Sequence, residues 1–143
     1  MRLQRTVVVD KPLNTVFDYL ADFTTTTEWD PGTVVTEKLH GDGGVDTAYL
    51  NTSTFLGRQT HLQYVVQELL PGERVRLRAE NQSVISVDTM TFSPTGQGGT
   101  EVTYTAEFTF KGPARFLAPF LRPAFARLGT AAENGMYEAL TRL

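Results

Sequence analysis

Cysteine is absent from the 143 residues of this chain, and histidine and tryptophan are scarce, with two copies and one copy. The lack of cysteine excludes disulfides, thiolate metal sites and a cysteine nucleophile. Basic residues are also few, because 13 lysines and arginines stand against 16 acidic residues and give a net charge of −3. Domains that bind nucleic acid generally carry a clear basic excess, so no nucleic-acid partner is expected.

Long apolar runs are missing as well. No stretch approaches the roughly 18 apolar residues of a transmembrane helix. The start of the chain, residues 1–5, lacks the apolar core of a signal peptide, so we expect a cytoplasmic protein. The length fits one domain, residues 1–143, and hydrophobic residues at 41% supply a core.

The residues that are present fall into patterns typical of strands and helices. Residues 2–10 alternate between two faces and predict a strand, and residues 12–23 repeat apolar side chains at helical spacing, which predicts a short helix with a further turn after it. From residue 33 to residue 110 threonine, valine, tyrosine and phenylalanine are dense and turn residues recur at short intervals. We place six antiparallel strands at 33–40, 46–55, 58–69, 73–81, 84–93 and 100–110.

After Pro113 the pattern becomes helical again. Pro119 and Pro123 lack the backbone N–H of a helix interior, so we predict an irregular approach over 113–122 and a long helix from Pro119 or Pro123 to about Thr141. The fold class is therefore α+β, with a seven-stranded curved antiparallel sheet around the C-terminal helix and one or two short helices between the first two strands. A curved sheet that grips one helix rarely closes completely, so a cavity is expected between them.

Four segments of the chain carry a family resemblance: VVVDKPLNTVFDYLAD at 7–22, EWDPG at 28–32, LQYVVQELLPGERV at 62–75 and GGTEVTY at 98–104. They resemble the SRPBCC superfamily of START and Bet v 1-like proteins, and look closest to its polyketide cyclase/dehydrase and lipid-transport branch. The resemblance covers essentially the whole chain and implies the helix-grip fold. It implies no single function, because the superfamily includes ligand carriers, cyclases, coenzyme Q-binding proteins and stress sensors.

The alternation of the strands predicts which side chains face the helix. On 100–110 the inward set includes Tyr104, and on 84–93 it includes Asp88 by the same period. A buried carboxylate is costly unless it is paired, so Asp88 should have a partner or a raised pKa. Asp88 and Tyr104 are therefore the catalytic candidates. The alternative is that the strand carries a bulge or that Asp88 lies at a wet cavity mouth.

Aromatic and aliphatic side chains from several elements are expected to line the cavity. Tyrosine hydroxyls could bond a ligand carbonyl, and the single tryptophan resembles a family tryptophan that follows the first helix. Each of these residues could equally be a packed core residue. The candidate ligand-binding residues are Trp29, Tyr49, Tyr64, Leu77, Met90, Tyr104, Phe108, Phe120, Leu121, Phe125 and Leu128.

The two histidines, His40 and His61, fall at a strand end and on an outward strand face, so both are expected on the surface. Two lone histidines without cysteine make a weak metal site, and no Ser-His-Asp set can be picked out. The glycine clusters at 41–44 and 96–99 join strands rather than precede a helix, which is typical of hairpin turns and not of a phosphate loop. We therefore expect no metal and no cofactor.

Residues 111–127, which we name the gate segment, contain cations and no acid, interleaved with phenylalanine and leucine. We interpret this segment as a gate at the cavity mouth whose apolar side chains touch a hydrophobic ligand. Its cations Lys111, Arg115 and Arg122 would meet an anionic head group or membrane surface. The alternative is an ordinary core-facing helix whose arginine stems lie along the apolar surface.

The favoured function is binding or transport of a small hydrophobic ligand such as a lipid, isoprenoid or polyketide, without catalysis. An aromatic-lined cavity with few polar groups suits binding better than chemistry. One alternative is a polyketide cyclase or dehydratase that acts in the same cavity with Asp88 and a tyrosine as acid and base. A protein-interaction module is the other alternative. Homodimer formation stays open, since some similar families pair as dimers.

Overall fold

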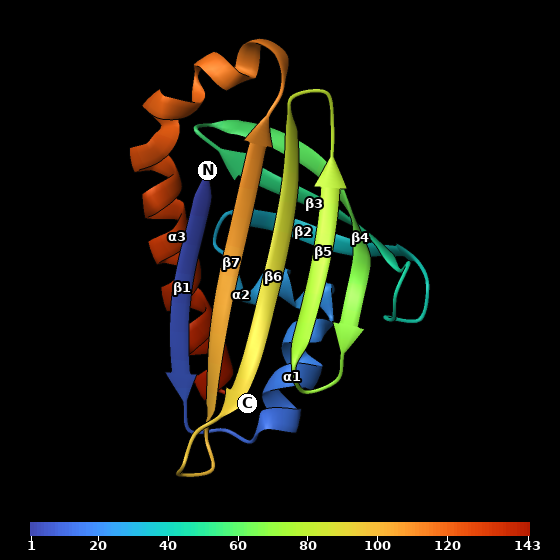
Figure 1. The fold of residues 1–143 in the computed structure, drawn as a ribbon, viewed down its shortest axis with the longest axis vertical. Coiled ribbons are helices and arrows are strands. Elements are labelled where there is room, and N and C mark those ends of the chain that lie inside the picture. Colours follow the sequence, from blue (N-terminus) through green and yellow to red (C-terminus); the bar gives the residue numbers. More distant parts are fainter.

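The computed structural model describes residues 1–143, and Figure 1 shows a curved sheet with one long helix against it. The strands are β1 (Arg2–Val9), β2 (Thr33–His40), β3 (Ala48–Phe55), β4 (Arg58–Leu70), β5 (Arg74–Glu80), β6 (Val84–Pro94) and β7 (Thr100–Phe110). They form one seven-stranded antiparallel sheet in the order β1-β7-β6-β5-β4-β3-β2. The predicted meander and the predicted α+β helix-grip class are confirmed.

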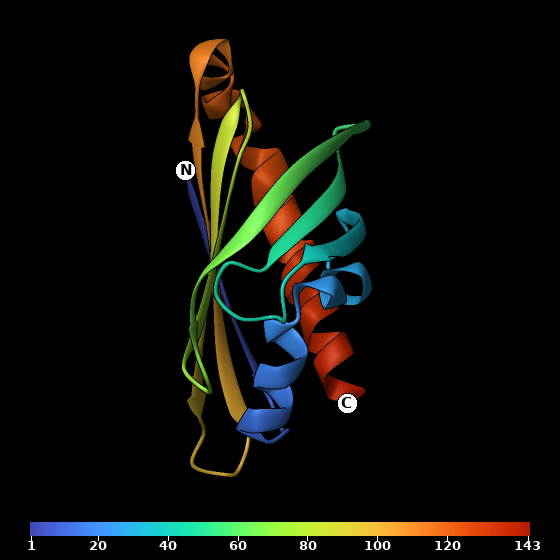
Figure 2. The same ribbon diagram turned by 90° about the vertical axis from the view of Figure 1, so that its right-hand side faces the viewer.

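Helices lie on one side of this sheet (Figure 2). Between β1 and β2 the chain forms α1 (Leu13–Ala21), a 3-10 turn η1 (Phe23–Thr25) and α2 (Thr26–Trp29). After β7 it forms a second 3-10 turn, η2 (Gly112–Phe116), and then α3 (Ala118–Thr141). None of the helices combines the length and the hydropathy that a membrane crossing needs.

The start of the long helix agrees with the sequence prediction. Helix α3 begins one residue before Pro119, and Pro123 lies inside it. The irregular approach predicted over 113–122 is confined to η2 and Leu117, since the residues after them are helical. Because proline at 123 cannot donate to the carbonyl four residues earlier, the first turn of α3 lacks one of its hydrogen bonds.

The inward faces of the strands follow the predicted alternation. On β5, Val75, Leu77 and Ala79 are buried, and on β6 both Asp88 and Met90 are buried. The core fills the end of the sheet that α1 and the C-terminal half of α3 cover, with the α1 side chains at 16, 17 and 20 in its centre. Toward the other end the β3–β4 hairpin curls away from the rest of the sheet toward α3 (Figure 2). Side chains fill this second end less completely.

Candidate functional site

A cavity of about 340 Å³ lies between the concave face of the sheet and the N-terminal half of α3. Aromatic rings from both the helix and the sheet line it. The ring of Phe125 from α3 stacks on Phe55 of β3 with a centroid distance of 4.6 Å, and it lies 4.9 Å from Phe108 of β7. These rings join the helix to both sides of the sheet. The volume falls near the lower end of the range for small-molecule sites, roughly 300–1,000 Å³.

The two ends of the cavity differ in their lining, and ionisable side chains lie only at the inner end. Val84 and Phe110 pair at the ends of β6 and β7, and both line the mouth. Tyr104, Asp88 and Tyr64 line the inner end, further along the same two strands and β4. Of the 24 lining residues 14 are hydrophobic, so an apolar body has more surface to contact than a polar one.

Four side chains at the inner end form a connected polar cluster, which consists of Tyr64, Ser86, Asp88 and Tyr104. The Tyr104 hydroxyl donates to Asp88 Oδ2 at 2.9 Å, and Ser86 Oγ donates to Asp88 Oδ1 at 3.4 Å. The Tyr64 hydroxyl lies 3.1 Å from Ser86 Oγ. Tyr64 of β4 and Ser86 of β6 both lie level with Ala79 of β5, and Tyr104 of β7 lies diagonal to Asp88, so the register of these four strands brings the side chains together.

Burial is the main influence on the titration of this cluster. It raises the pKa of Asp88 to about 7; the hydrogen bond from Tyr104 opposes this rise, whereas the negative charge of Asp30 adds to it. Burial also raises the pKa values of Tyr64 and Tyr104 well above the ordinary value, so both hydroxyls stay protonated at neutral pH. Asp88 therefore changes its charge near neutral pH.

Asp30 is the second carboxylate at the inner end. Burial raises its pKa, against hydrogen bonds from the Gly32 amide at 3.0 Å and the Thr33 hydroxyl at 3.0 Å. No lysine, arginine or histidine lines the cavity. Arg5 borders a smaller adjoining cavity that Asp30 also lines, but its guanidinium pairs with Glu133 at 3.4 Å. Both carboxylates thus face the cavity without a cation.

Trp29 lines the same cavity from the end of α2. Its indole is 2% exposed and meets the ring of Tyr104 edge to face, with centroids 5.7 Å apart. The indole Nε1 is buried and has no hydrogen-bond partner within the protein, and no other buried side-chain nitrogen or oxygen shares this condition. An unpaired buried donor costs about 1–3 kcal/mol.

Most of the candidate residues from the sequence line this cavity. Both catalytic candidates, Asp88 and Tyr104, lie at its inner end and are hydrogen-bonded to each other. The ligand-binding candidates that line the cavity are Trp29, Tyr64, Tyr104, Phe108, Leu121, Phe125 and Leu128.

Four other candidates do not line the cavity, so their expected position was wrong. Tyr49, Leu77 and Met90 are fully buried in the core, where strand alternation does point them inward but α1 and its neighbours cover them. Tyr49, for example, packs against Phe23 with centroids 5.9 Å apart. Phe120 is 82% exposed, because Leu117 and Leu121 occupy the cavity side of this helical turn.

Some lining residues were not identified from the sequence. Asn51, Ser53 and Phe55 of β3 alternate into the cavity. Their alternation predicts that they share one face of the strand. Two of the three are polar, however, so the pattern does not indicate that this face is buried. Asp30 lies directly after the tryptophan in the segment EWDPG, where only the tryptophan was singled out.

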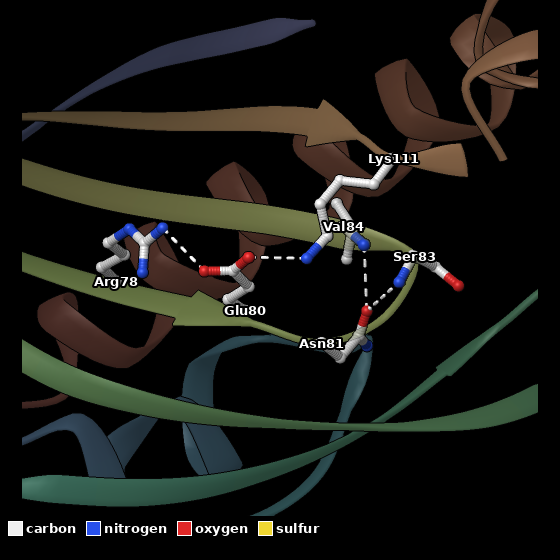
Figure 3. Close-up of polar contacts among 6 residues, drawn as sticks. All are labelled: Arg78, Glu80, Asn81, Ser83, Val84 and Lys111. Carbon is white, nitrogen blue, oxygen red and sulfur yellow. Dashed lines mark hydrogen bonds and ion pairs between the residues drawn. The ribbon is translucent and has the colours of Figure 1, made fainter.

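One rim of the mouth is held by the ion-pair network in Figure 3. Lys111 Nζ lies 2.6 Å from Glu80, and Arg78 lies 2.9 Å from the other oxygen of the same carboxylate. Hydrogen bonds from these two cations lower the pKa of Glu80. The network ties the end of β7 to β5. Lys111 is therefore engaged with Glu80, whereas Arg115 and Arg122, the other two cations predicted for a membrane surface, have no acidic partner, and Arg115 lies over the ring of Phe116 at 4.9 Å.

The β5–β6 turn completes this rim. The Asn81 side chain accepts hydrogen bonds from the backbone amides of Ser83 at 2.8 Å and Val84 at 3.0 Å (Figure 3). All three residues line the cavity. An asparagine that bonds the backbone two and three residues ahead stabilises a tight turn, so the shape of this rim is well defined.

The gate segment continues this rim after Lys111. Ala114, Leu117 and Leu121 line the cavity from η2 and the first turn of α3. Phe116 and Phe120 point away from it and are 66% and 82% exposed. The segment therefore presents apolar side chains to both the cavity and the solvent.

Comparison with known proteins bears on the fold and the family. The family model described as polyketide cyclase / dehydrase and lipid transport matches residues 1–141. No curated protein matches the chain by sequence.

Several solved structures share the architecture. An aromatase/cyclase, ZhuI from Streptomyces sp. R1128, matches with a TM-score of 0.85 at 16% identity, over 99% of this chain and 94% of that chain. A START superfamily protein from Mycobacterium smegmatis matches with a TM-score of 0.70 at 17% identity, over 98% and 99% of the two chains. At these identities the likeness concerns the fold. Since the family model spans nearly every residue, the chain belongs to the polyketide cyclase/dehydrase and lipid transport family.

Proposed function

We propose that this protein binds or carries a small hydrophobic molecule, such as a lipid, an isoprenoid or a polyketide, in the cavity between the sheet and α3. The observation that carries the proposal is the cavity itself, about 340 Å³ in volume with 14 hydrophobic residues among the 24 that line it. Burial of apolar ligand surface there supplies roughly 25 cal/mol per Å². The few polar groups at the inner end then orient the ligand.

Two variants in which an alanine is replaced by tryptophan test the site. Ala114→Trp places a large ring at the mouth, whereas Ala126→Trp places the same ring on an exposed position of α3 that does not line the cavity. The probe is N-phenyl-1-naphthylamine, an uncharged dye that fluoresces in apolar surroundings. Wild type and Ala126→Trp should bind one dye per chain, and Ala114→Trp should bind it at least about tenfold more weakly. Equal binding by all three proteins would contradict the proposal.

We also propose that the gate segment touches anionic membranes when the ligand is exchanged. Leu117, Phe116 and Phe120 are all more than half exposed. On the β3–β4 turn, which lies at the same end of the molecule (Figure 2), Leu56 is 64% exposed and has a φ of 52°. This left-handed conformation is unfavourable for a leucine. Apolar side chains and unpaired arginines around one opening support contact with a lipid surface.

Sedimentation with vesicles tests this contact. Arg115→Glu/Arg122→Glu reverses two charges of the gate segment, and the control Arg76→Glu/Arg142→Glu reverses two exposed charges elsewhere. On phosphatidylcholine vesicles with about one third phosphatidylserine, the gate variant should bind about tenfold or more weakly than the control. Equal binding by the two variants would contradict a contact between the gate segment and anionic membranes.

A cyclase or dehydratase that acts in the same cavity is the second candidate. It is favoured by one observation: Asp88, whose pKa burial raises to about 7, is hydrogen-bonded to Tyr104, and both line the cavity. A group that titrates near the working pH suits general acid–base catalysis. With a poly-β-ketone substrate, Asp88→Asn should abolish turnover in this case and leave binding of the uncharged dye intact. Binding without turnover in the wild type would favour the carrier.

A further inference from the structure

Asp88 is a carboxyl group whose charged form receives little support from the protein. It is 5% exposed and lines the inner end of the cavity. Two hydroxyl groups contact it, those of Tyr104 at 2.9 Å and Ser86 at 3.4 Å. Burial outweighs these bonds and raises the pKa of Asp88 to about 7, so both charge states are populated at neutral pH.

No cation faces Asp88 from the elements packed around it. Its neighbours across the sheet are Leu77 of β5 and Ala106 of β7, and α3 contributes only apolar side chains to the cavity. The ionisable residues that line the cavity are Asp30, Tyr64, Asp88 and Tyr104. The two tyrosines stay neutral at neutral pH, because burial raises their pKa values well above the ordinary value.

Arg5 of β1 does not supply the missing cation. It lines the smaller adjoining cavity, where its guanidinium pairs with Glu133 of α3 at 3.4 Å and donates to the Ala126 carbonyl at 3.2 Å. Among charged groups, Asp30 alone shifts the pKa of Asp88, and its negative charge raises that pKa further. The ionised form of Asp88 therefore depends on water that reaches it through the cavity.

We propose that an uncharged ligand binds together with a proton, which Asp88 holds while the cavity is occupied. This inference rests on the proposed function, because it assumes that an apolar molecule fills the cavity. Such a molecule replaces water beside Asp88 with apolar surface, and no cation is in place to stabilise the carboxylate. Binding takes up the proton from the solvent, and release of the ligand returns it.

The proton makes occupancy of the cavity depend on pH. At a pH where Asp88 is already protonated, the affinity for the ligand is constant. At higher pH, part of the binding free energy is spent on protonating Asp88, so the affinity falls. A pKa that rises by about one unit on binding corresponds to about a tenfold change in affinity. Acid conditions therefore load the cavity, and alkaline conditions favour release.

The sign of the coupling depends on the charge that the ligand brings to the inner end. An uncharged ligand raises the pKa of Asp88 and takes up a proton. A cationic group beside Asp88 would stabilise the carboxylate and release a proton instead. The number of protons exchanged on binding therefore tests the proposal directly, provided that the probe itself is uncharged.

The dye N-phenyl-1-naphthylamine is such a probe, and it is used with the full chain. Its affinity is measured by fluorescence at about pH 6 and at about pH 9, on either side of the range in which Asp88 titrates. Calorimetry at about pH 7.5 in phosphate and in Tris, two buffers with different enthalpies of ionisation, gives the number of protons taken up per dye.

Wild type should bind the dye about tenfold more weakly at the higher pH, and should take up about half a proton per dye at about pH 7.5. Asp88→Asn cannot ionise, so it should bind the dye equally at both pH values and take up no proton. Asp18→Asn, which changes an exposed carboxylate of α1, should behave as wild type does. The calorimetry of wild type needs no variant, so it stands even where Asp88→Asn fails to fold.

Equal affinity of wild type at both pH values, without proton uptake, would overturn the inference and leave the proposed cavity function standing. Proton release on binding would overturn it in the same way, and so would a pH dependence that Asp88→Asn retains in full. If the dye binds at neither pH, the proposed function falls together with the inference.

Discussion

The Tyr104 hydroxyl donates a 2.9 Å hydrogen bond to Asp88, a buried carboxyl group that has no cation beside it. This bond favours the ionised form of Asp88 and so holds its pKa lower than burial alone would. Tyr104→Phe should therefore raise the pKa of Asp88 above about 7. A carbon NMR titration of the carboxyl group measures it. Tyr19→Phe, which removes a tyrosine bonded to Glu28 instead, is the control. An unchanged or lower pKa would show that the bond has no such effect.

The raised pKa of Asp88 makes folding stability depend on pH. In the folded protein its pKa lies at about 7, against an ordinary value of 3.8, so between these values the folded state holds a proton that the unfolded chain has released. The stability that this residue contributes is fully present below pH 3.8 and is lost as the pH rises through about 7. The rise corresponds to about 4 kcal/mol.

Asp88→Asn should remove that dependence. Relative to wild type, the variant should therefore gain stability between about pH 5 and about pH 8, so its free energy of unfolding minus that of wild type should increase. Urea unfolding at both values measures the difference, and Asp18→Asn serves as the exposed control. A difference between variant and wild type that stays constant with pH would mean that Asp88 is ionised throughout.

Pro123 should weaken the first turn of α3, where Leu117 and Leu121 close the cavity. Pro123→Ala restores a backbone N–H, and alanine is favoured over proline inside a helix by about 3 kcal/mol. Hydrogen exchange of the amides around residues 118–124 should slow, and release of the bound dye should slow with it. Pro119→Ala is the matched control, because position 119 lies in the first turn, where an N–H has no helical partner. Equal effects of both changes would argue against a local weakness at 123.

The two interactions at the rim in Figure 3 should differ in strength. Glu80→Gln breaks partly exposed ion pairs with Arg78 and Lys111, and should lower the free energy of unfolding less than Asn81→Ala does, because solvent screens such pairs. Asn81→Ala removes an acceptor from two backbone amides and should cost about 1–2 kcal/mol. Thermal unfolding of both variants measures the order, and a larger loss for Glu80→Gln would reverse this view of the rim.

Alternation along the strands was enough to predict the face of each strand, and it placed Asp88 and Tyr104 under the helix. It could not predict whether an inward side chain lies at the packed end of the sheet or at the cavity. Leu77 and Met90 share the inward face with Asp88, yet they lie where core side chains pack against them, because the position of the cavity depends on how the β3–β4 hairpin curls and where α1 ends.

Helical spacing in the gate segment had a similar limit. Phe116, Leu117, Phe120 and Leu121 are all apolar, so the sequence shows two candidate faces and does not say which faces the cavity. The pairing of Lys111 with Glu80 depends on how the ends of β5 and β7 meet. The unpaired Trp29 donor depends on the exact orientation of a ring. None of these follows from a local pattern.

Native mass spectrometry of the purified protein, followed by organic extraction of whatever it releases, tests the central claim most directly. Wild type, mixed with a lipid extract of the cells that produce it, should carry one hydrophobic molecule per chain. Ala126→Trp should carry the same molecule and Ala114→Trp should not. A wild-type chain that stays bare after this mixing, or an adduct that Ala114→Trp retains in full, would contradict a ligand-binding cavity between the sheet and α3.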